Sequence, residues 1–408
     1  MFKPLIDSFN YFKCNQNYKK KLEELHSRKN TTPIRVCFLV RENQKWSYQS
    51  LYELLDKSED FEPIVLVSLL WLSHIGKDPT RNNLEENYNF FKERGMNVQY
   101  AYENGEYLDL RNFEPDILFY DQPWDLPKIH QPASVSKFAL TCYVPYGIGL
   151  FNLKDDYTTV FHKLLFKFYI ENEITYERFH KAKNCYIAGN PKFDFYSESI
   201  TVSEEKLWKN PTCKKIIYAP HHSLDKKGMG LATFKENGKF ILKYAKTHPE
   251  TTWVFKPHPR LKYALLRNKI MTKDEINKYY NAWGKIGNVV ENGNYFDLFK
   301  TSDLLVTDCC SFLAEYLPTN KPIIRLSPKN KMDFNQLGFL INDSCYEVKN
   351  NKDLNFWLSC LLFRKNTDTK QNLRTKALLN LIDLNIKSAN KIYKNICDEL
   401  NIERRFYG

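Results

Sequence analysis

Two short segments of this sequence concentrate side chains that bind anions and move protons. His221 and His222 directly follow one apolar run. Lys256, His258 and Arg260 follow a second apolar run and alternate with two prolines. Prolines favour extended backbone, in which every second side chain lies on the same side. Three cationic or titratable groups on one side suit a pyrophosphate. The paired histidines can serve as a general base or a phosphate ligand, or one of them can be an ordinary surface residue.

A third polar segment ends the apolar run at residues 303–307 and contains Asp308 and Ser311. Ser311 lies where a predicted strand turns into a helix, so the backbone N–H groups of the first helical turn can bind an anion. Glu315 lies one turn further on the same side, where it can accept a hydrogen bond from a ribose hydroxyl. The alternative is a simple helix cap, with Glu315 favourable to the helix dipole.

The elements that must position these residues are short apolar strands alternating with helices of 10–20 residues, a pattern typical of βαβ units with parallel sheets. Helices are predicted at 46–55 and around 158–169. The polar residues 196–213 are predicted to form a linker between two α/β halves. The predicted strands are 34–40, 63–68, 97–100, 115–120, 139–144, 184–189, 215–219, 252–255, 289–290, 303–307 and 322–326. Proteins built on open parallel α/β sheets bind their ligands at the C-terminal ends of the strands.

The predicted organisation has four parts. Residues 1–30 form a basic extension with seven Lys/Arg and three acidic residues, either a solvated helix or a contact for a membrane surface or partner. Residues 31–200 and 210–365 form two Rossmann-like domains. Residues 366–408 form a C-terminal helical region.

Composition narrows the class of protein. The chain has 408 residues, 43% hydrophobic and 26% charged, which excludes a disordered chain and a polytopic membrane protein. Its longest apolar run, 64–72, is too short to cross a bilayer, and its N-terminus has no secretory signal pattern. Ten cysteines without a CxxC pair are typical of a reducing cytoplasm. The net charge of +12 favours an anionic partner.

Several motifs are absent. The sequence has no P-loop, no complete dinucleotide fingerprint, no DxD and no HExxH. We therefore expect no tightly held metal and no cofactor. Lys and Arg are interleaved with acidic residues along the chain, so we expect no nucleic-acid partner.

Four motifs in order resemble the CDP-glycerol glycerophosphotransferase family, bacterial enzymes that build teichoic-acid-like and capsule polymers. Their order and rough spacing agree with the family over residues 140–330. In chain order the motifs are Gly189-Asn-Pro191-Lys192-Phe193-Asp194, Tyr218-Ala-Pro220, Lys256-Pro-His258-Pro259, and Thr307-Asp308-Cys309-Cys310-Ser311 with Glu315. The resemblance implies a GT-B fold, in which two Rossmann-like domains face a cleft and a C-terminal helix crosses back. It implies that the first domain binds the acceptor and the second the nucleotide donor.

This sequence departs from the family pattern at three places. Tyr146 stands where the family usually has the His that is the favoured catalytic base, and a tyrosine is a poor base at its ordinary pKa of ~10. Cys309 and Cys310 replace Tyr and Ser, which removes hydroxyls from the phosphate site. His221 and His222 stand where the family has Thr and often Arg.

The expected activity is transfer of a phosphoalditol, such as glycerol phosphate, or a related group. The donor is a nucleotide diphosphate, CDP-linked by resemblance, and the acceptor is a hydroxyl of a surface glycan or lipid-linked glycan. Lys256, His258 and Arg260 neutralise the diphosphate, Asp308, Ser311 and Glu315 complete the nucleotide site, and His221, His222 or Tyr146 contacts the acceptor.

Three alternatives remain open at this stage: a GT-B glycosyltransferase using a nucleotide sugar, a nucleotide-sugar epimerase, and a non-enzymatic binding protein for nucleic acid. We expect a cytoplasmic enzyme whose basic ends rest on the anionic inner face of the cell membrane.

Overall fold

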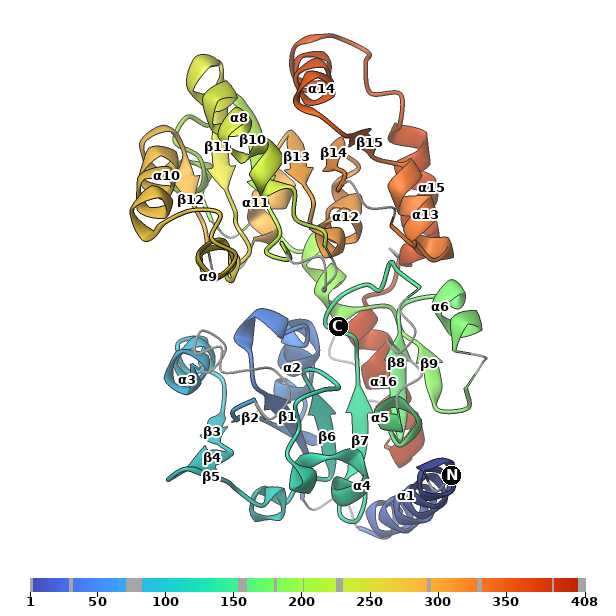
Figure 1. The fold of residues 1–408 in the computed structure, drawn as a ribbon. Helices are drawn as coiled ribbons and strands as arrows, with labels where there is room; N and C mark the ends of the chain where they lie inside the picture. Colours follow the sequence, from blue (N-terminus) through green and yellow to red (C-terminus); the bar gives the residue numbers. More distant parts are fainter. Residues whose placement is uncertain are drawn as a thin grey trace. The chain divides into compact units, whose positions relative to one another are not determined.

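The computed structural model describes residues 3–28, 32–70, 83–152, 160–179, 182–200, 202–224, 230–291, 295–328, 332–383 and 385–402. The chain divides into two compact units (Figure 1). The first contains residues 1–147, 153–195 and 382–408, and the second contains residues 148–152 and 196–381.

The first unit is built on a parallel sheet of seven described strands. Their order is β3 (Val98–Tyr100), β2 (Phe61–Val67), β1 (Ile34–Val40), β6 (Ile117–Tyr120), β7 (Leu140–Tyr143), β8 (Lys167–Ile170) and β9 (Cys185–Ile187). A small antiparallel hairpin joins β4 (Tyr102–Glu103) and β5 (Glu106–Tyr107). The unit's helices are α1 (Lys3–Ser27), α2 (Gln49–Asp56), α3 (Leu84–Lys92), α4 (Pro132–Val135), α5 (Val160–Lys163), α6 (Glu173–Arg178) and α16 (Ser388–Leu400).

Both faces of this sheet are buried, as the nearly continuous apolar sequence of β1 requires. Successive side chains of a strand point to opposite faces. Accordingly, Val36 and Phe38 pack into one hydrophobic cluster with residues of α2 and α16, while Cys37 and Leu39 pack into a second cluster with residues of α4 and α5.

The C-terminal helix α16 belongs to the first unit, where Asp194 caps it. The Asp194 carboxylate accepts hydrogen bonds from the backbone N–H groups of Ser388 (2.7 Å) and Ala389 (2.9 Å). Gly189 has φ +85°, and a Cβ there would lie 2.4 Å from the Ser388 hydroxyl. In the described structure, these two members of the 189–194 motif therefore anchor the returning chain.

The second unit has a parallel sheet of six described strands. Their order is β12 (Asn288–Val289), β11 (Thr251–Phe255), β10 (Lys214–Ala219), β13 (Leu304–Thr307), β14 (Ile323–Leu326) and β15 (Tyr346–Val348). Numbered within the unit this is 3-2-1-4-5-6, the doubly wound order whose switch point lies between the first and fourth strands. The first unit has the same order with one strand added beyond the sixth.

The helices of the second unit connect and cover these strands. They are α7 (Glu204–Leu207), α8 (Phe234–Thr247), α9 (Leu261–Arg267), α10 (Lys273–Ile286), α11 (Phe296–Thr301), α12 (Cys310–Tyr316), α13 (Gln336–Asp343), α14 (Asn351–Phe363) and α15 (Gln371–Leu381). An aromatic core joins the sheet to these helices: Tyr218 of β10 and Phe255 of β11 pack against Trp283 of α10.

Three local expectations differ from the structure. The helix expected around 158–169 is wrong: among its described residues a single turn, α5, is followed by strand β8, because the aromatic run at 168–170 is buried within the sheet. The expected linker 196–213 is packed, since Trp208 is fully buried and its indole N–H donates to the Thr301 hydroxyl (2.9 Å). The C-terminal helical region divides, with α15 in the second unit and α16 in the first.

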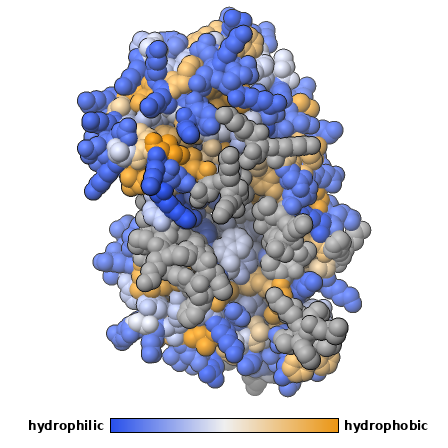
Figure 2. Space-filling view, viewed as in Figure 1, coloured by the Kyte–Doolittle hydropathy of each residue, from blue (hydrophilic) through white to orange (hydrophobic). Residues whose placement is uncertain are grey.

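The coloured part of the face drawn in Figure 2 carries mostly hydrophilic residues, with apolar residues in separate patches. Among the described residues no helix is long and apolar enough to cross a membrane.

Candidate active site

The switch point of the second unit brings together residues that follow β10 and β13. Asp308 comes directly after β13, and its carboxylate accepts a hydrogen bond from the backbone N–H of His221 (2.6 Å), just beyond β10. It also accepts from the backbone N–H (2.6 Å) and the hydroxyl (2.8 Å) of Thr233, at the start of α8. Burial outweighs these donors and raises the pKa of Asp308 to about 6. Asp308 thus acts as a positioning residue for the histidine loop.

His221, His222 and His258 form one cluster at this edge of the sheet. The ring centroids of His222 and His258 lie 3.9 Å apart, those of His221 and His222 4.4 Å, and those of His221 and His258 5.2 Å. Burial lowers the pKa of His221 to about 3, helped by His222 and Arg260. Burial also holds the pKa of His258 well below its ordinary value. His221 is therefore a neutral imidazole at pH 7.

Backbone contacts determine which ring nitrogen carries the proton in two of these histidines. The N–H of Ser223 points at Nδ1 of His221 (3.2 Å), and the N–H of Arg260 points at Nδ1 of His258 (3.1 Å). An Nδ1 that accepts a hydrogen bond leaves the proton of a neutral imidazole on Nε2. Both rings are therefore neutral hydrogen-bond donors through Nε2.

Two cationic side chains accompany the cluster from the segment after β11. Lys256 is 6% exposed, and its ammonium group donates to the carbonyl of Glu291 (3.3 Å). Arg260 precedes α9. Both side chains contribute to the low pKa of His258. Together with the Nε2–H donors they make this edge of the sheet favourable for a multiply charged anion.

Ser311 and Glu315 lie on the short helix α12, directly after the same strand that ends at Asp308. The Ser311 hydroxyl lies 3.4 Å from the sulfur of Cys309, whose pKa burial raises to about 11. Glu315 is 2% exposed and accepts a hydrogen bond from the hydroxyl of Tyr295. The Lys256 ammonium lies 5.4 Å from the centre of the Tyr295 ring. Tyr295 therefore connects Glu315 to the cationic segment.

Within the described residues, the three histidines also form a group whose ring nitrogen atoms could share a metal ion, since these atoms all lie within 4.8 Å of one another. Two arguments favour an anion there instead. With Nε2 protonated and Nδ1 accepting a backbone hydrogen bond, neither ring nitrogen of His221 or His258 offers a lone pair to a metal. Lys256 and Arg260 add positive charge, which repels a cation.

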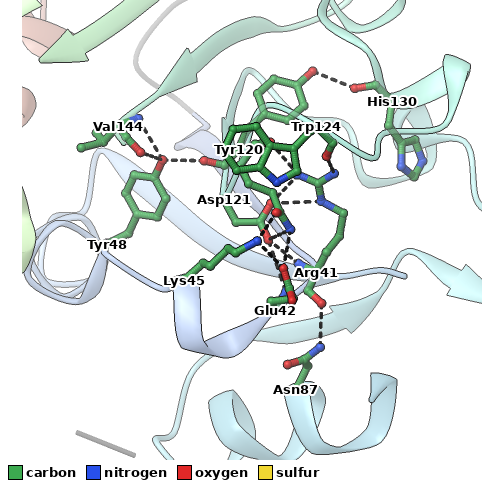
Figure 3. Close-up of polar contacts among 11 residues, drawn as sticks. Arg41, Glu42, Lys45, Tyr48, Asn87, Tyr120, Asp121, Trp124, His130 and Val144 are labelled. Carbon is green, nitrogen blue, oxygen red and sulfur yellow. Dashed lines mark hydrogen bonds and ion pairs between the residues drawn. The ribbon is translucent and has the colours of Figure 1, made fainter. Parts of the chain in front are cut away.

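Tyr146, the remaining candidate, belongs to the first unit and follows β7. Its ring meets that of Trp124 edge to face, with centroids 6.0 Å apart, and the Lys45 ammonium lies 5.0 Å from its centre. At the switch point of this sheet, Arg41 after β1 pairs with Asp121 after β6 (Figure 3). Arg41 and Asp121 have no exposed side-chain surface.

Sequence reasoning missed Arg41, Asp121, Trp124 and Tyr295. The signal that located the histidines, polar residues directly after an apolar strand, is present at Arg41 and Asp121 as well. Trp124 and Tyr295 carry no such signal, because they follow no strand directly and become neighbours of the site residues only through loop geometry.

A family model matches the middle of the chain, from the end of the first unit into most of the second. The family model described as CDP-glycerol:poly(glycerophosphate) glycerophosphotransferase matches residues 155–340. The match covers a little less than half of the chain, which resembles the glycerophosphotransferase family over these residues. The chain is accordingly a transferase of the CDP-glycerol glycerophosphotransferase type, and the matched region contains every candidate site residue of the second unit. None of the curated proteins matches the sequence significantly.

Solved structures show that this glycerophosphotransferase region is part of a GT-B fold. A variant of the wall teichoic acid polymerase TagF aligns with a TM-score of 0.61 at 15% identity, covering 96% of this chain and 98% of that chain. The UDP-GlcNAc 2-epimerase from Neisseria meningitidis bound to UDP-GlcNAc aligns with a TM-score of 0.57 at 12% identity, covering 90% and 100%. The MnaA–UDP structure from S. aureus gives 0.58 at 12%, covering 91% and 98%.

Proposed function

We propose that this enzyme transfers a glycerol-phosphate-like group from a CDP-activated donor to a hydroxyl of a capsule-type or teichoic-type bacterial surface glycan. The observation that carries the proposal is the histidine cluster with Lys256 and Arg260 at the switch point of the second unit, inside the region that matches the glycerophosphotransferase family. This is the position where doubly wound sheets bind their ligands.

In the proposed reaction the acceptor oxygen attacks the β-phosphorus of the donor in line. A new P–O bond forms as the bond to the leaving CMP breaks, and CMP departs with that electron pair. Lys256 and Arg260 neutralise the diphosphate, while the Nε2–H groups of His221 and His258 donate to its oxygens. Such chemistry depends mainly on positioning and charge stabilisation. Removing one of these contacts should cost roughly 2–4 kcal/mol of transition-state stabilisation.

We assign the acceptor's proton to His222. Its ring packs against that of His258, so it lies beside the groups that would hold the diphosphate. Tyr146 donates a hydrogen bond to a substrate oxygen but is not the essential base, because an unperturbed phenol is almost wholly protonated at pH 7.

We propose further that the enzyme works without a metal, in the cytoplasm, on the inner face of the membrane. Helix α1 supports a membrane contact. Its exposed side includes Phe9 (56% exposed), Tyr11 (44%) and Phe12 (59%), next to Lys13. Aromatic and basic side chains on one helix suit the interface of an anionic membrane, where a lipid-linked acceptor would be available.

A nucleotide panel tests the donor site. CMP and CDP should raise the melting temperature more than UDP and GDP, since a ligand at 100 times its Kd adds about 2.7 kcal/mol of stability. His258→Gln should abolish this shift. The matched control is His248→Gln, which changes a histidine that stacks on Tyr244 outside the cluster. An equal response of both variants to CMP would overturn the assignment of the site.

Turnover separates the proposed reaction from its alternatives. With CDP-glycerol and a glycan acceptor, phosphorus NMR should record release of CMP, and EDTA should leave the rate unchanged. The structural likeness to UDP-GlcNAc 2-epimerases favours one second candidate, a nucleotide-sugar enzyme. Selective stabilisation by UDP and turnover of UDP-sugars, as a glycosyltransferase or an epimerase, would support that candidate and contradict ours.

A further inference from the structure

The first unit has its own switch point, between β1 and β6, in the same topological position as the histidine cluster of the second unit. Open α/β sheets bind ligands at this position, outside the carboxyl ends of the strands. The side chains collected there are Arg41, Lys45, Asp121 and Trp124 (Figure 3). Tyr146, from the end of the neighbouring β7, joins them through Lys45 and Trp124.

The buried Arg41–Asp121 pair fixes the loop that carries Trp124. Arg41 donates to the Asp121 carboxylate through Nε (3.0 Å) and a terminal nitrogen (2.6 Å), and to the carbonyl of Trp124 (2.5 Å). It also donates to the carbonyl of Gln122 (2.6 Å). Buried ion pairs add little stability over apolar packing, so their use here points to positioning. Asp125 next to Trp124 has φ +58°, a conformation that non-glycine residues adopt where the surrounding structure enforces it.

The loop presents an aromatic surface with polar groups beside it. Trp124 is 39% exposed, and its ring stands at 88° to that of Tyr146. The Lys45 ammonium lies 5.7 Å from the centre of the Trp124 ring and 5.0 Å from that of Tyr146. Lys45 itself contacts Glu42 and the side-chain oxygen of Gln122.

This combination matches the chemistry of a sugar ring. The C–H groups of a pyranose carry a small positive charge and pack on the negative face of an aromatic ring, while its hydroxyls need donors and acceptors at the edge. Trp124 and Tyr146 supply the aromatic faces, and Lys45, with the carboxylate and amide beside it, supplies the polar edge. We propose that Trp124, Tyr146 and Lys45 form a subsite for one sugar ring of a glycan. The identification of this glycan as the acceptor rests on the proposed function.

Sugar binding tests the subsite directly, without turnover. The probes are the methyl glycosides of glucose, galactose and N-acetylglucosamine, with glycerol and glycerol 3-phosphate as comparators, titrated into the full-length protein and followed by saturation-transfer NMR. At least one glycoside should bind at millimolar concentration. Trp124→Ala should weaken that glycoside roughly 5- to 10-fold, and Trp124→Phe should retain most of the affinity. The matched control is Trp357→Ala, which removes a tryptophan that stacks on Tyr346 in the second unit.

Two results would overturn the subsite: failure of every glycoside to bind, or equal binding by the Trp124→Ala and Trp357→Ala proteins. Binding of phosphatidylglycerol vesicles through Trp124, in place of glycosides, would also contradict it by assigning this surface to a membrane. The CMP shift of the wild-type protein reports the donor site separately. If CMP gives no shift while glycosides bind through Trp124, the proposed function fails and the sugar subsite stands.

Discussion

Replacing Asp121 by Asn should destabilise the first unit more than any exchange of an exposed charge. The Asp121 carboxylate accepts from two nitrogens of the Arg41 guanidinium and from the backbone N–H of Arg41 (2.7 Å) and Glu42 (3.3 Å). An Asn side chain keeps one acceptor oxygen and turns an N–H donor toward the others. The guanidinium then stays buried without a counter-charge.

The expected size of this effect follows from that burial. Breaking a buried ion pair by removing one partner costs about 3–5 kcal/mol. A domain of about 150–250 residues shifts its melting temperature by about 2–4 °C per kcal/mol, so the unfolding transition of this unit should fall by roughly 10 °C. The double variant Arg41→Met/Asp121→Leu should recover only part of the loss, because the backbone N–H groups of residues 41 and 42 lose their acceptor.

Differential scanning calorimetry measures this shift. The matched control is Glu114→Gln, which removes an 80% exposed partner of Arg35 in the same unit and should leave the transition unchanged. CMP binding to the second unit should be unaffected by either variant. If Asp121→Asn melts at the same temperature as the control, the argument that this pair holds the Trp124 loop is refuted.

Three further predictions concern the catalytic chemistry. Tyr146→Phe should retain measurable turnover, whereas His222→Ala should lower kcat on the order of 10²-fold or more, and the reverse result would assign the base to a tyrosine of shifted pKa. The pKa of His221 is about 3 in the folded protein and about 6.5 in the unfolded chain, so the unfolded state binds more protons between these two pH values. The free energy of unfolding should therefore fall as the pH drops from 6.5 to 3. His221→Gln should flatten this part of the stability–pH curve, and an unchanged slope would contradict the assigned pKa. Glu315→Gln should weaken CMP about tenfold by calorimetry and leave 2′-deoxy-CMP unaffected, whereas equal weakening of both would exclude a contact with the ribose hydroxyl.

The positions of the histidines and Asp308 illustrate what local sequence can predict. Each directly follows an apolar strand, and parallel strands bring their carboxyl ends to one edge of a sheet. His221 and Asp308 are 87 residues apart, yet adjacent pairing of β10 with β13 puts a hydrogen bond between them. Their roles in the reaction remain predictions, since proximity alone assigns no chemistry.

The motif at 189–194 shows the opposite case. Its residues follow β9, and the family resemblance includes this segment among its four motifs. In the structure Asp194 caps α16, and Gly189 makes room for Ser388. The partners lie almost two hundred residues further along the chain, where no local pattern indicates them.

The sequence by itself determined the alternation of strands and helices, because apolar periodicity acts locally. The GT-B fold followed from the resemblance of four motifs to a known family, and the anion-binding role of the second unit stays a prediction. Tertiary structure decided the properties that depend on neighbours distant in sequence. Burial, helped by His222 and Arg260, lowers the pKa of His221 and keeps its ring neutral, and the backbone N–H of Ser223 favours its Nε2 tautomer. Arg41 and Asp121 become a buried pair only when β1 and β6 are adjacent, and that pair then places Trp124 beside Tyr146.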